Sequence, residues 1–297
     1  MKIGFIGLGQ MGKPMAMNML RSDGIDLVVY SADQSCYGEF IRAGVRTAES
    51  LSDLCDSQAI FLCLPNGDVV KNVLFGANGL ADKLAKGTVV VDHSTIEHGS
   101  TMEIGAALEA RGIRFLDAPV SGMESRAVDG TLTVMCGGES STFEWAEPFL
   151  RCVGNNILFM GPRGSGQLTK LVNQLLFDIN CAALAEVLPM AIKMGLDADK
   201  IASVVNSGTG RSYASEFFVP RVLQRQFSAG YPLTHAYKDL VSAAELGARQ
   251  CIPMPVLAAS TATYQQALLA GHGALDKGAM ILPFERALGV EFRSEAK

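Results

Sequence analysis

The stretch Lys2-Ile-Gly-Phe-Ile-Gly-Leu-Gly-Gln-Met-Gly12 decides how the first half of this chain folds. Ile3, Phe5 and Ile6 form a short apolar run that predicts a buried strand, and a helical pattern follows from residue 11 to about residue 20. A GxGxxG turn between a strand and a helix is the arrangement that binds the pyrophosphate of a dinucleotide. The alternative is a plain strand-to-helix turn, because the pattern alone is weak. The residues expected to contact the cofactor are Gly7, Leu8, Gly9, Gln10, Met11 and Gly12.

Each glycine of this turn has a separate physical reason. Gly7 permits the tight turn, and Gly9 lets backbone N–H groups approach a pyrophosphate. Gly12 lets the helix pack close to the strand while the positive end of the helix faces the phosphates. These three positions together favour the dinucleotide interpretation over the plain turn.

Length and composition describe a compact globular protein. The chain has 297 residues, enough for one large or two ordinary domains, and we expect two. Hydrophobic residues make up 48% and charged residues 19%, and no apolar run reaches the roughly 18 residues that span a bilayer. A net charge of -5 without a basic stripe argues against nucleic acid as a partner. The sequence therefore predicts neither a membrane protein nor a nucleic-acid-binding protein.

The cysteines indicate reduced thiols rather than a disulfide framework or a metal site. They are scattered, odd in number, without a CxxC pair and without a histidine at metal-ligand spacing, which favours reduced core thiols and no metal. The N-terminus shows no basic region followed by an apolar segment, so we expect no secretory signal and a cytoplasmic protein. The cysteines are Cys36, Cys55, Cys63, Cys136, Cys152, Cys181 and Cys251.

The end of the predicted second strand, residues 27–30, is where a dinucleotide fold meets the adenosine ribose. An acid there binds the 2'-hydroxyl of NAD, whereas an arginine favours the 2'-phosphate of NADP. The chain continues with Ser31, Ala32 and Asp33. A carboxylate at Asp33 would repel a 2'-phosphate, so we expect NAD, with NADP as the alternative if Asp33 is only a surface carboxylate.

Further strands alternate with helices up to about residue 160. Loops after two of the strands carry small or polar residues, His93 and Thr95 among them, where open α/β sheets bind ligands. A lone histidine next to an aspartate is more often structural than catalytic, and we interpret His93 so. The segment 117–130 is expected to be a functional loop between strands. The expected strands are residues 58–64, 88–92, 113–116, 131–136 and 157–160, with helices at 102–111 and 141–151.

The second half shows only helical periods. The change comes near residues 162–166, so we expect an α/β dinucleotide-binding domain over residues 1–163 and an all-helical domain over residues 164–297. The first of these helices carries Lys170, Asn173 and Gln174 near its start, with Lys170 and Gln174 on one face. This pattern fits a ligand-facing helix end and a snorkelling lysine equally well. The expected helices are residues 167–195, 197–207, 215–224, 235–250 and 255–269.

The chain resembles the β-hydroxyacid dehydrogenases, in particular the 3-hydroxyisobutyrate dehydrogenase group, and more distantly 6-phosphogluconate dehydrogenase. The similarity covers nearly the whole length. It rests on GFIGLGQMGKPMAMNML, LPNGDVVKNVLFGANG, DAPVSG, GTLTVMCGG, GSGQLTKLVNQ and Lys238-Asp239-Leu240, in that order. The resemblance implies a Rossmann-type N-terminal domain, an all-helical C-terminal domain and an active site between them.

The resemblance also implies residue roles. Ser121 and the Gly122 backbone would hold the substrate carboxylate next to Met123, and Lys170 would be the general acid/base, assisted by Asn173 and Gln174. Lys238 and Asp239 would lie near the substrate and the cofactor, and Leu64, Pro65 and Thr95 would flank the nicotinamide. A lysine can act as a base only when its pKa is lowered, which burial and the positive nicotinamide ring both favour. The expected partners are a small hydroxy acid or semialdehyde and a second copy of the chain, as a homodimer or homotetramer.

Two departures from the family pattern affect the substrate. The usual SGG loop reads Ser121-Gly-Met-Glu-Ser-Arg126 here, and the second amide after the lysine is Gln174 rather than asparagine. The 64–79 segment also resembles sulfolactaldehyde reductases, which lack the Ser121-Gly122 pair. Candidate substrates are therefore of the 3-hydroxyisobutyrate, serine or threonine, glycerate or tartronate semialdehyde, or sulfolactaldehyde type. The alternatives are an imine reductase of the same fold, although those enzymes generally lack the lysine at 170, or a non-catalytic nucleotide-sensing module.

Overall fold

The computed structural model describes residues 1–294, and residues 295–297 lie outside the described part. The chain forms two compact units, Met1–Lys170 and Leu171–Lys297. The division falls inside one long helix, α7 (Ser165–Lys193). The boundary expected from sequence, between residues 163 and 164, precedes that helix.

The N-terminal unit is built on a single sheet whose strand order is β3-β2-β1-β4-β5-β6-β8-β7, with β9 paired to β8. Neighbours from β3 to β6 are parallel, whereas β8 runs antiparallel to β6 and β7. The parallel order with β1 beside both β2 and β4 places a topological switch at the end of β1, where such sheets bind ligands. The strands are β1 (Lys2–Ile6), β2 (Asp26–Tyr30), β3 (Arg46–Thr47), β4 (Ala59–Leu62), β5 (Val89–Asp92), β6 (Arg114–Asp117), β7 (Val120–Ser121), β8 (Leu132–Gly138) and β9 (Gly154–Gly161).

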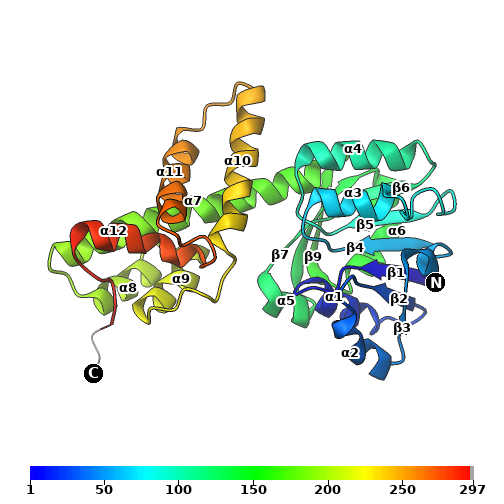
Figure 1. Cartoon of the computed structure of the whole chain (residues 1–297), viewed down its shortest axis with the longest axis horizontal. Coiled ribbons are helices and arrows are strands. Elements are labelled where there is room, and N and C mark those ends of the chain that lie inside the picture. Colours follow the sequence, from blue (N-terminus) through cyan, green and yellow to red (C-terminus); the bar gives the residue numbers. More distant parts are fainter. Residues whose placement is uncertain (295–297) are drawn as a thin grey trace. The chain divides into compact units, whose positions relative to one another are not determined.

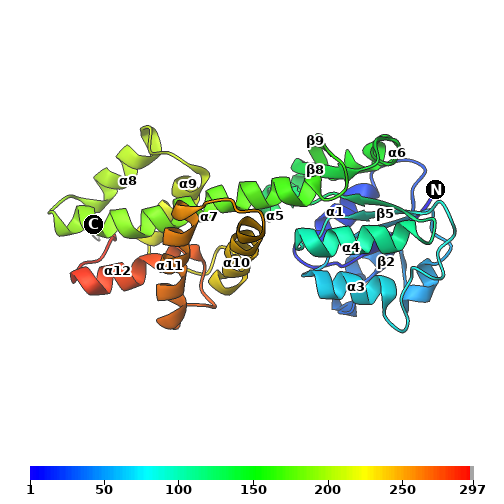
Figure 2. The same cartoon turned by 90° about the horizontal axis from the view of Figure 1, so that it is seen from above.

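Helices cover both faces of this sheet. Side chains alternate along a strand, so Phe5 and Phe61 pack into one hydrophobic cluster with α1 and α6, while Ile6 and Leu62 pack into another with α3 and α4. Figure 1 and Figure 2 both show α3 and α4 side by side. The helices of this unit are α1 (Gly12–Met19), α2 (Tyr37–Arg42), α3 (Gly67–Phe75), α4 (His98–Glu109), α5 (Met123–Asp129) and α6 (Ser140–Leu150).

The segment 117–130, expected to be a loop, is partly regular. It contains the short strand β7, which pairs with β8, and the helix α5. The expectation of a plain loop was wrong because two short elements joined by Gly122 do not show a hydrophobic period. Gly122 has φ +144, and a Cβ there would lie 2.9 Å from the Arg126 side chain, so the sharp turn requires glycine.

The second unit is helical. No strand follows β9 among the residues up to 294, apart from one isolated bridge between Pro232 and Asp276. The unit has its own hydrophobic core, so the predicted class of an α/β domain followed by an all-α domain is confirmed. Besides the C-terminal part of α7, its helices are α8 (Ala198–Ser207), α9 (Tyr213–Leu223), α10 (Leu233–Arg249), α11 (Pro255–Leu269), the 3-10 turn η3 (Lys277–Met280) and α12 (Ile281–Leu288).

Helix α7 has the length that the sequence predicted and begins two residues earlier than residue 167, but the search for apolar runs did not single it out as long enough to span a bilayer. Its 29 residues are, by length and composition alone, enough to cross a membrane, and no other helix up to residue 294 meets that test. The count of unbroken apolar residues missed this because Lys170, Asp178 and Glu186 interrupt the run. A core helix of a soluble protein passes the same test, and Asp178 forms a buried ion pair within the helical unit.

Candidate active site

The glycine turn after β1 has the geometry that a dinucleotide cradle requires. The Gly7 N–H donates to the Tyr30 carbonyl at 2.9 Å, and Gly7 has φ +98, where a Cβ would lie 2.2 Å from the Cys63 carbonyl oxygen. A Cβ on Gly12 would lie 1.9 Å from the Gly7 carbonyl oxygen. Both glycines are therefore fixed by the protein's own packing.

Gly9 differs from Gly7 and Gly12. A Cβ at Gly9 would meet nothing within 4 Å, so the fold itself does not require glycine there. The space in front of Gly9 is open, and it lies where backbone N–H groups would face a pyrophosphate at the start of α1. The residues of this turn thus fit a dinucleotide, which would occupy the space that a side chain at Gly9 would fill.

The rest of the turn is held by its neighbours. Leu8 is buried in the core, and Met11 is half-buried against it. The Gln10 amide donates to the Glu124 carboxylate at 2.7 Å, which ties the turn to α5. The helix α5 begins directly after Ser121 and Gly122, so this contact joins the cofactor turn to the proposed substrate loop.

The end of β2 presents polar groups at the expected ribose position. The Ser31 N–H donates to the Tyr37 hydroxyl at 3.0 Å. The Asp33 carboxylate is exposed and accepts the Ser35 N–H at 2.9 Å, and hydrogen bonding to Ser35 lowers the pKa of Asp33. Asp33 is therefore a charged, accessible carboxylate that also caps the turn after β2.

The loops after β4 and β5 are tied together. The Leu64 N–H donates to the Ser94 hydroxyl at 2.9 Å, and the Ser94 N–H donates to the Asp92 carboxylate at 2.9 Å. Leu64 and Thr95 are half-buried, whereas Pro65 is exposed. The backbone on both sides of the expected nicotinamide position is thus fixed by hydrogen bonds within the N-terminal unit.

His93 is placed as a structural residue. Its ring is 2% exposed, its Nδ1 lies 2.7 Å from the Ala118 carbonyl oxygen, and its centroid lies 5.7 Å from that of Phe61. Burial lowers the pKa of His93 to about 4, so the ring is neutral at physiological pH. These contacts support the structural interpretation over a general base.

Ser121 stands at the end of β7, where it pairs with Thr133 of β8. Ser121, Gly122 and Met123 are half-buried, and Met123 has φ 62, which is rare for a residue with a side chain. Lys170, in the second turn of α7, is only 9% exposed. These four residues all lie within the N-terminal unit.

The remaining predicted residues belong to the helical unit. Asn173 is exposed and Gln174 half-buried on α7, one turn after Lys170. Lys238 is half-buried and Asp239 is 8% exposed, on α10.

Polar groups that the sequence did not single out are Asp117, Gln167, Asp178 and Lys277, all buried. Their only signal in the sequence is a charged or amide residue inside an apolar pattern.

Comparisons with known proteins agree with this geometry. Residues 2–161 match the family model described as the NAD-binding domain of 6-phosphogluconate dehydrogenase. Residues 164–284 match the model described as NAD-binding of NADP-dependent 3-hydroxyisobutyrate dehydrogenase.

Individual proteins match along nearly the full length. The chain is 35% identical over 291 residues to 2-(hydroxymethyl)glutarate dehydrogenase of Eubacterium barkeri, covering 97% of this chain and 96% of that protein. It is 34% identical over 282 residues to 3-sulfolactaldehyde reductase of Escherichia coli (strain K12), covering 94% of each. The crystal structure of 3-hydroxyisobutyrate dehydrogenase from Salmonella typhimurium superposes with a TM-score of 0.85 at 29% identity, over 95% of this chain and 99% of that one. The chain therefore belongs to the β-hydroxyacid dehydrogenase family of NAD(P)-dependent oxidoreductases, as the sequence motifs indicated.

Proposed function

We propose that this protein transfers a hydride between a nicotinamide cofactor and a small β-hydroxy acid or the matching semialdehyde, with Lys170 as the general acid/base. The observation that carries the proposal is the nearly complete burial of Lys170, at the start of a helix that begins against the dinucleotide-binding sheet. Burying an ionisable side chain is costly, and a buried lysine close to a cofactor-binding sheet is a candidate for proton transfer.

The chain's own residues would divide the work of the reaction. When bound, the nicotinamide supplies the hydride acceptor or donor. Ser121 and the Gly122 N–H would hold the substrate carboxylate, and Lys170 would take or give the hydroxyl proton. Asn173 and Gln174 would orient the same hydroxyl, and Lys238 and Asp239 would complete the substrate and cofactor contacts.

The substrate class is a small hydroxy acid, and the relatives differ in what is attached to it. Their names specify a dicarboxylate, a sulfonate and a branched monocarboxylate. All three are anions that carry a hydroxyl or aldehyde group. The Met123 side chain and the length of Gln174 would set the size of the pocket, which makes these two positions the first to vary when substrate preference is studied.

The cofactor preference is proposed to be NAD. The support is the exposed, ionised Asp33 carboxylate at the end of β2, which opposes the added charge of a 2'-phosphate. We further propose that the protein is cytoplasmic, and that its domains divide at residues 163 and 164.

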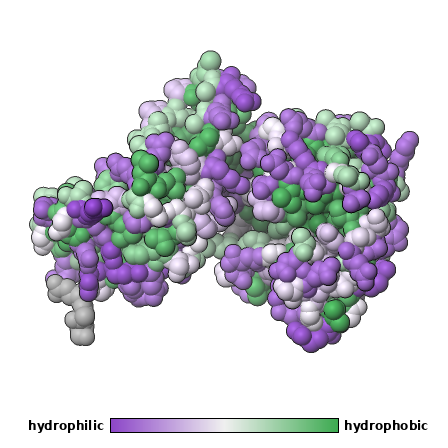
Figure 3. All heavy atoms as spheres, in the orientation of Figure 1, coloured by the Kyte–Doolittle hydropathy of each residue, from purple (hydrophilic) through white to green (hydrophobic). Residues whose placement is uncertain are grey.

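Assembly as a homodimer or homotetramer is proposed from α7. Val172, Leu176, Val187 and Met190 are each at least half exposed, and helical spacing puts them on one face of α7, opposite Lys170. Figure 3 shows hydrophobic side chains exposed among hydrophilic ones on the helical unit. A second copy of the chain would cover such a face. Light scattering that finds a monomer at micromolar concentration would rule this out.

The catalytic proposal is tested by Lys170→Ala, with Lys193→Ala as a matched control. Lys193 lies on the same helix, but it is exposed and its ammonium donates to the Leu288 carbonyl at the surface. A panel of 3-hydroxyisobutyrate, serine, threonine, glycerate, threonate, sulfolactaldehyde and 2-(hydroxymethyl)glutarate, followed by nicotinamide absorbance, first identifies the best substrate. Loss of acid–base catalysis costs about 10²- to 10⁴-fold in kcat, whereas NAD affinity should change little.

The control should keep full activity. If Lys170→Ala keeps more than about a tenth of kcat, the acid/base assignment is wrong and Lys238 becomes the candidate. If no substrate of the panel turns over while NAD binds measurably, the chain is a nucleotide-sensing module instead.

A further inference from the structure

The first turn of α7 is held by a buried carboxylate at the end of β6. Asp117 is completely buried; its Oδ1 accepts the Gly164 N–H at 2.7 Å and its Oδ2 accepts the Gln167 N–H at 3.0 Å. Burial raises the pKa of Asp117, and the N–H groups oppose that rise. The carboxylate thus satisfies donors that every helix leaves unpaired at its N-terminus.

The side chain of Gln167 ties the same turn to the loop after β5. Gln167 is 3% exposed; its Nε2 donates to the Ser94 carbonyl at 2.7 Å, and its Oε1 accepts the Ile96 N–H at 3.3 Å. The residue between Ser94 and Ile96 is Thr95, which the family resemblance places beside the nicotinamide. One amide side chain therefore clamps both neighbours of Thr95.

Two glycines let the helix approach the strand ends this closely. A Cβ on Gly166 would lie 2.3 Å from the Met135 carbonyl oxygen and 2.7 Å from Asp117 Oδ2. A Cβ on Gly137 of β8 would lie 2.8 Å from Asp117 Oδ1 and from the Gly166 nitrogen. The start of α7 is thus packed backbone against backbone, and it has little freedom to shift.

We propose that Asp117 and Gln167 are positioning residues that fix Lys170 relative to Thr95 and Ser121. This inference rests on the proposed role of Lys170. Lys170 follows Gln167 by three residues, so it lies one turn along the helix from the clamp. Asp117 also stands four residues before Ser121, at the start of the segment that leads to the substrate loop. Because a displacement of about 1 Å costs on the order of 10²-fold in rate, anchoring of this kind has a direct catalytic consequence.

The test uses Gln167→Leu, which keeps the size of the side chain and removes both hydrogen bonds of the clamp. We expect kcat on the best substrate of the panel to fall by roughly 10- to 100-fold, with NAD affinity within a few-fold of the unaltered protein. Gln167→Glu keeps an acceptor for the Ile96 N–H but sets a buried carboxylate against the Ser94 carbonyl oxygen, so it should lose at least as much activity as Gln167→Leu. The control is Leu108→Ala, at a fully buried position of α4. This substitution creates a cavity and lowers stability, but it leaves the hydrogen bonds of Gln167 untouched.

A double-mutant cycle separates positioning from mere support of the fold. If Gln167 acts through Lys170, Gln167→Leu should have almost no further effect once Lys170 is alanine. An equal loss in both backgrounds, or a kcat within twofold of the unaltered protein, overturns the inference. Should the activity of Lys170→Ala fall below detection, the comparison of Gln167→Leu with Leu108→Ala decides alone. An active Lys170→Ala protein is a different failure, because it refutes the proposed function itself.

Discussion

Asp117 in the N-terminal unit and Asp178 in the helical unit are both completely buried, and the two carboxylates have different kinds of partner. Asp117 in the N-terminal unit accepts backbone N–H groups from the start of a helix. Asp178 in the helical unit accepts from the ammonium of Lys277, which is itself 1% exposed. The first carboxylate organises a piece of backbone near the proposed site, whereas the second forms an ion pair between two side chains.

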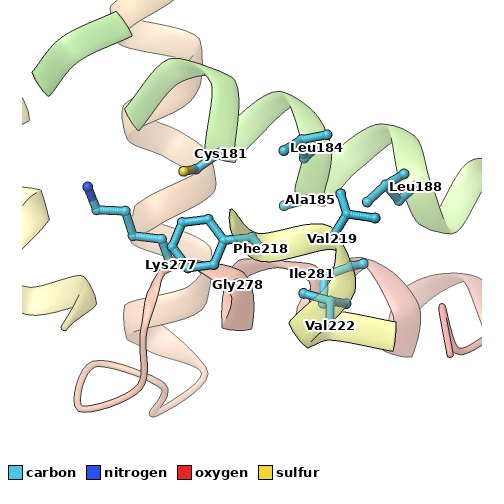
Figure 4. Close-up of a pocket in the computed structure, with 10 residues that line it drawn as sticks. All are labelled: Cys181, Leu184, Ala185, Leu188, Phe218, Val219, Val222, Lys277, Gly278 and Ile281. Carbon is cyan, nitrogen blue, oxygen red and sulfur yellow. The ribbon is translucent and has the colours of Figure 1, made fainter. Parts of the chain in front are cut away.

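The surroundings of the Asp178–Lys277 ion pair show that burying its carboxylate is unfavourable. Burial raises the pKa of Asp178 to about 6, although the Lys277 ammonium opposes the rise, and Asp178 Oδ2 has no hydrogen-bond partner among the described residues. Lys277 Nζ lies 4.3 Å from the centre of the Phe177 ring. In Figure 4 the Lys277 side chain passes Phe218 beside a mostly apolar cavity of about 20 Å³, and its amine points away from Ile281 and Val222.

This comparison separates two uses of a buried charge. A carboxylate that caps a helix gains several hydrogen bonds from groups that need a partner in any case. A buried ion pair loses the hydration free energy of two ions, and the attraction between the ions offsets only part of that loss. The N-terminal unit therefore uses its buried charge to hold backbone next to the proposed site, and for the pair in the helical unit we expect a small net contribution to stability.

The largest effect should come from breaking that pair. Lys277→Met leaves the Asp178 charge uncompensated, and we expect the free energy of unfolding of the helical unit to fall by about 3 to 5 kcal/mol. The double variant Asp178→Leu with Lys277→Met removes both charges and should recover most of that loss. Urea titration followed by circular dichroism measures both values. A double variant that is no more stable than Lys277→Met would show that the pair itself stabilises the unit.

A second carboxylate in the N-terminal unit, Asp92, sharpens the comparison, because its Oδ1 accepts the Ser94 N–H while its Oδ2 is left without a partner. Asp92 lies beside Asp117 in the sheet register, and its Oδ2 has no hydrogen-bond partner among the described residues. Burial raises the pKa of Asp92 to about 7, and the Asp117 charge acts in the same direction. Because this pKa lies above the value of about 3.9 in an unfolded chain, the folded state loses stability as pH rises from about 4 to 7.

Asp92→Asn should remove that dependence. The amide oxygen still accepts the Ser94 N–H, but no charge develops at high pH. We expect the stability of Asp92→Asn relative to the unaltered protein to grow by about 2 to 3 kcal/mol between pH 5 and pH 8. Thermal or urea unfolding at a series of pH values measures this difference. A constant difference across that range would mean that Asp92 keeps an ordinary pKa.

The sequence predicted the glycine turn of the N-terminal unit better than it predicted the buried polar contacts of the two units. The turn from Gly7 to Gly12 was recognisable because each glycine has a local reason. The pairing of Asp178 with Lys277 was not, because the two residues are 99 positions apart and nothing local relates them. Asp117 and Gln167 were missed for the same reason, since a helix cap supplied from a distant strand leaves no pattern in the helix itself.

The turn from Gly7 to Gly12 allows a test that separates an effect on protein stability from an effect on cofactor binding. Gly9→Ala introduces a methyl group into open space, so the melting temperature should not change, yet the methyl would stand where a pyrophosphate approaches. We expect NAD affinity to fall about tenfold, which corresponds to about 1.4 kcal/mol. Gly12→Ala is the counterpart, because its Cβ overlaps the Gly7 carbonyl, and it should lower the melting temperature. Isothermal titration and thermal unfolding distinguish the two, and unchanged NAD binding by Gly9→Ala would place the cofactor elsewhere.

The smallest effect is expected at Asp33, which is exposed to solvent, unlike the buried Asp92, Asp117 and Asp178. Water and salt screen its charge, so its influence on a 2'-phosphate is modest even when it faces the ribose. Asp33→Asn keeps an oxygen to accept the Ser35 N–H and removes the charge, so it should raise kcat/KM for NADP by about two- to fivefold and leave that for NAD nearly unchanged. The increase should shrink as salt is added, because screening already weakens the repulsion in the unaltered protein. A tenfold preference of the unaltered protein for NADP would show that Asp33 faces away from the ribose and that Ser31 accepts the phosphate.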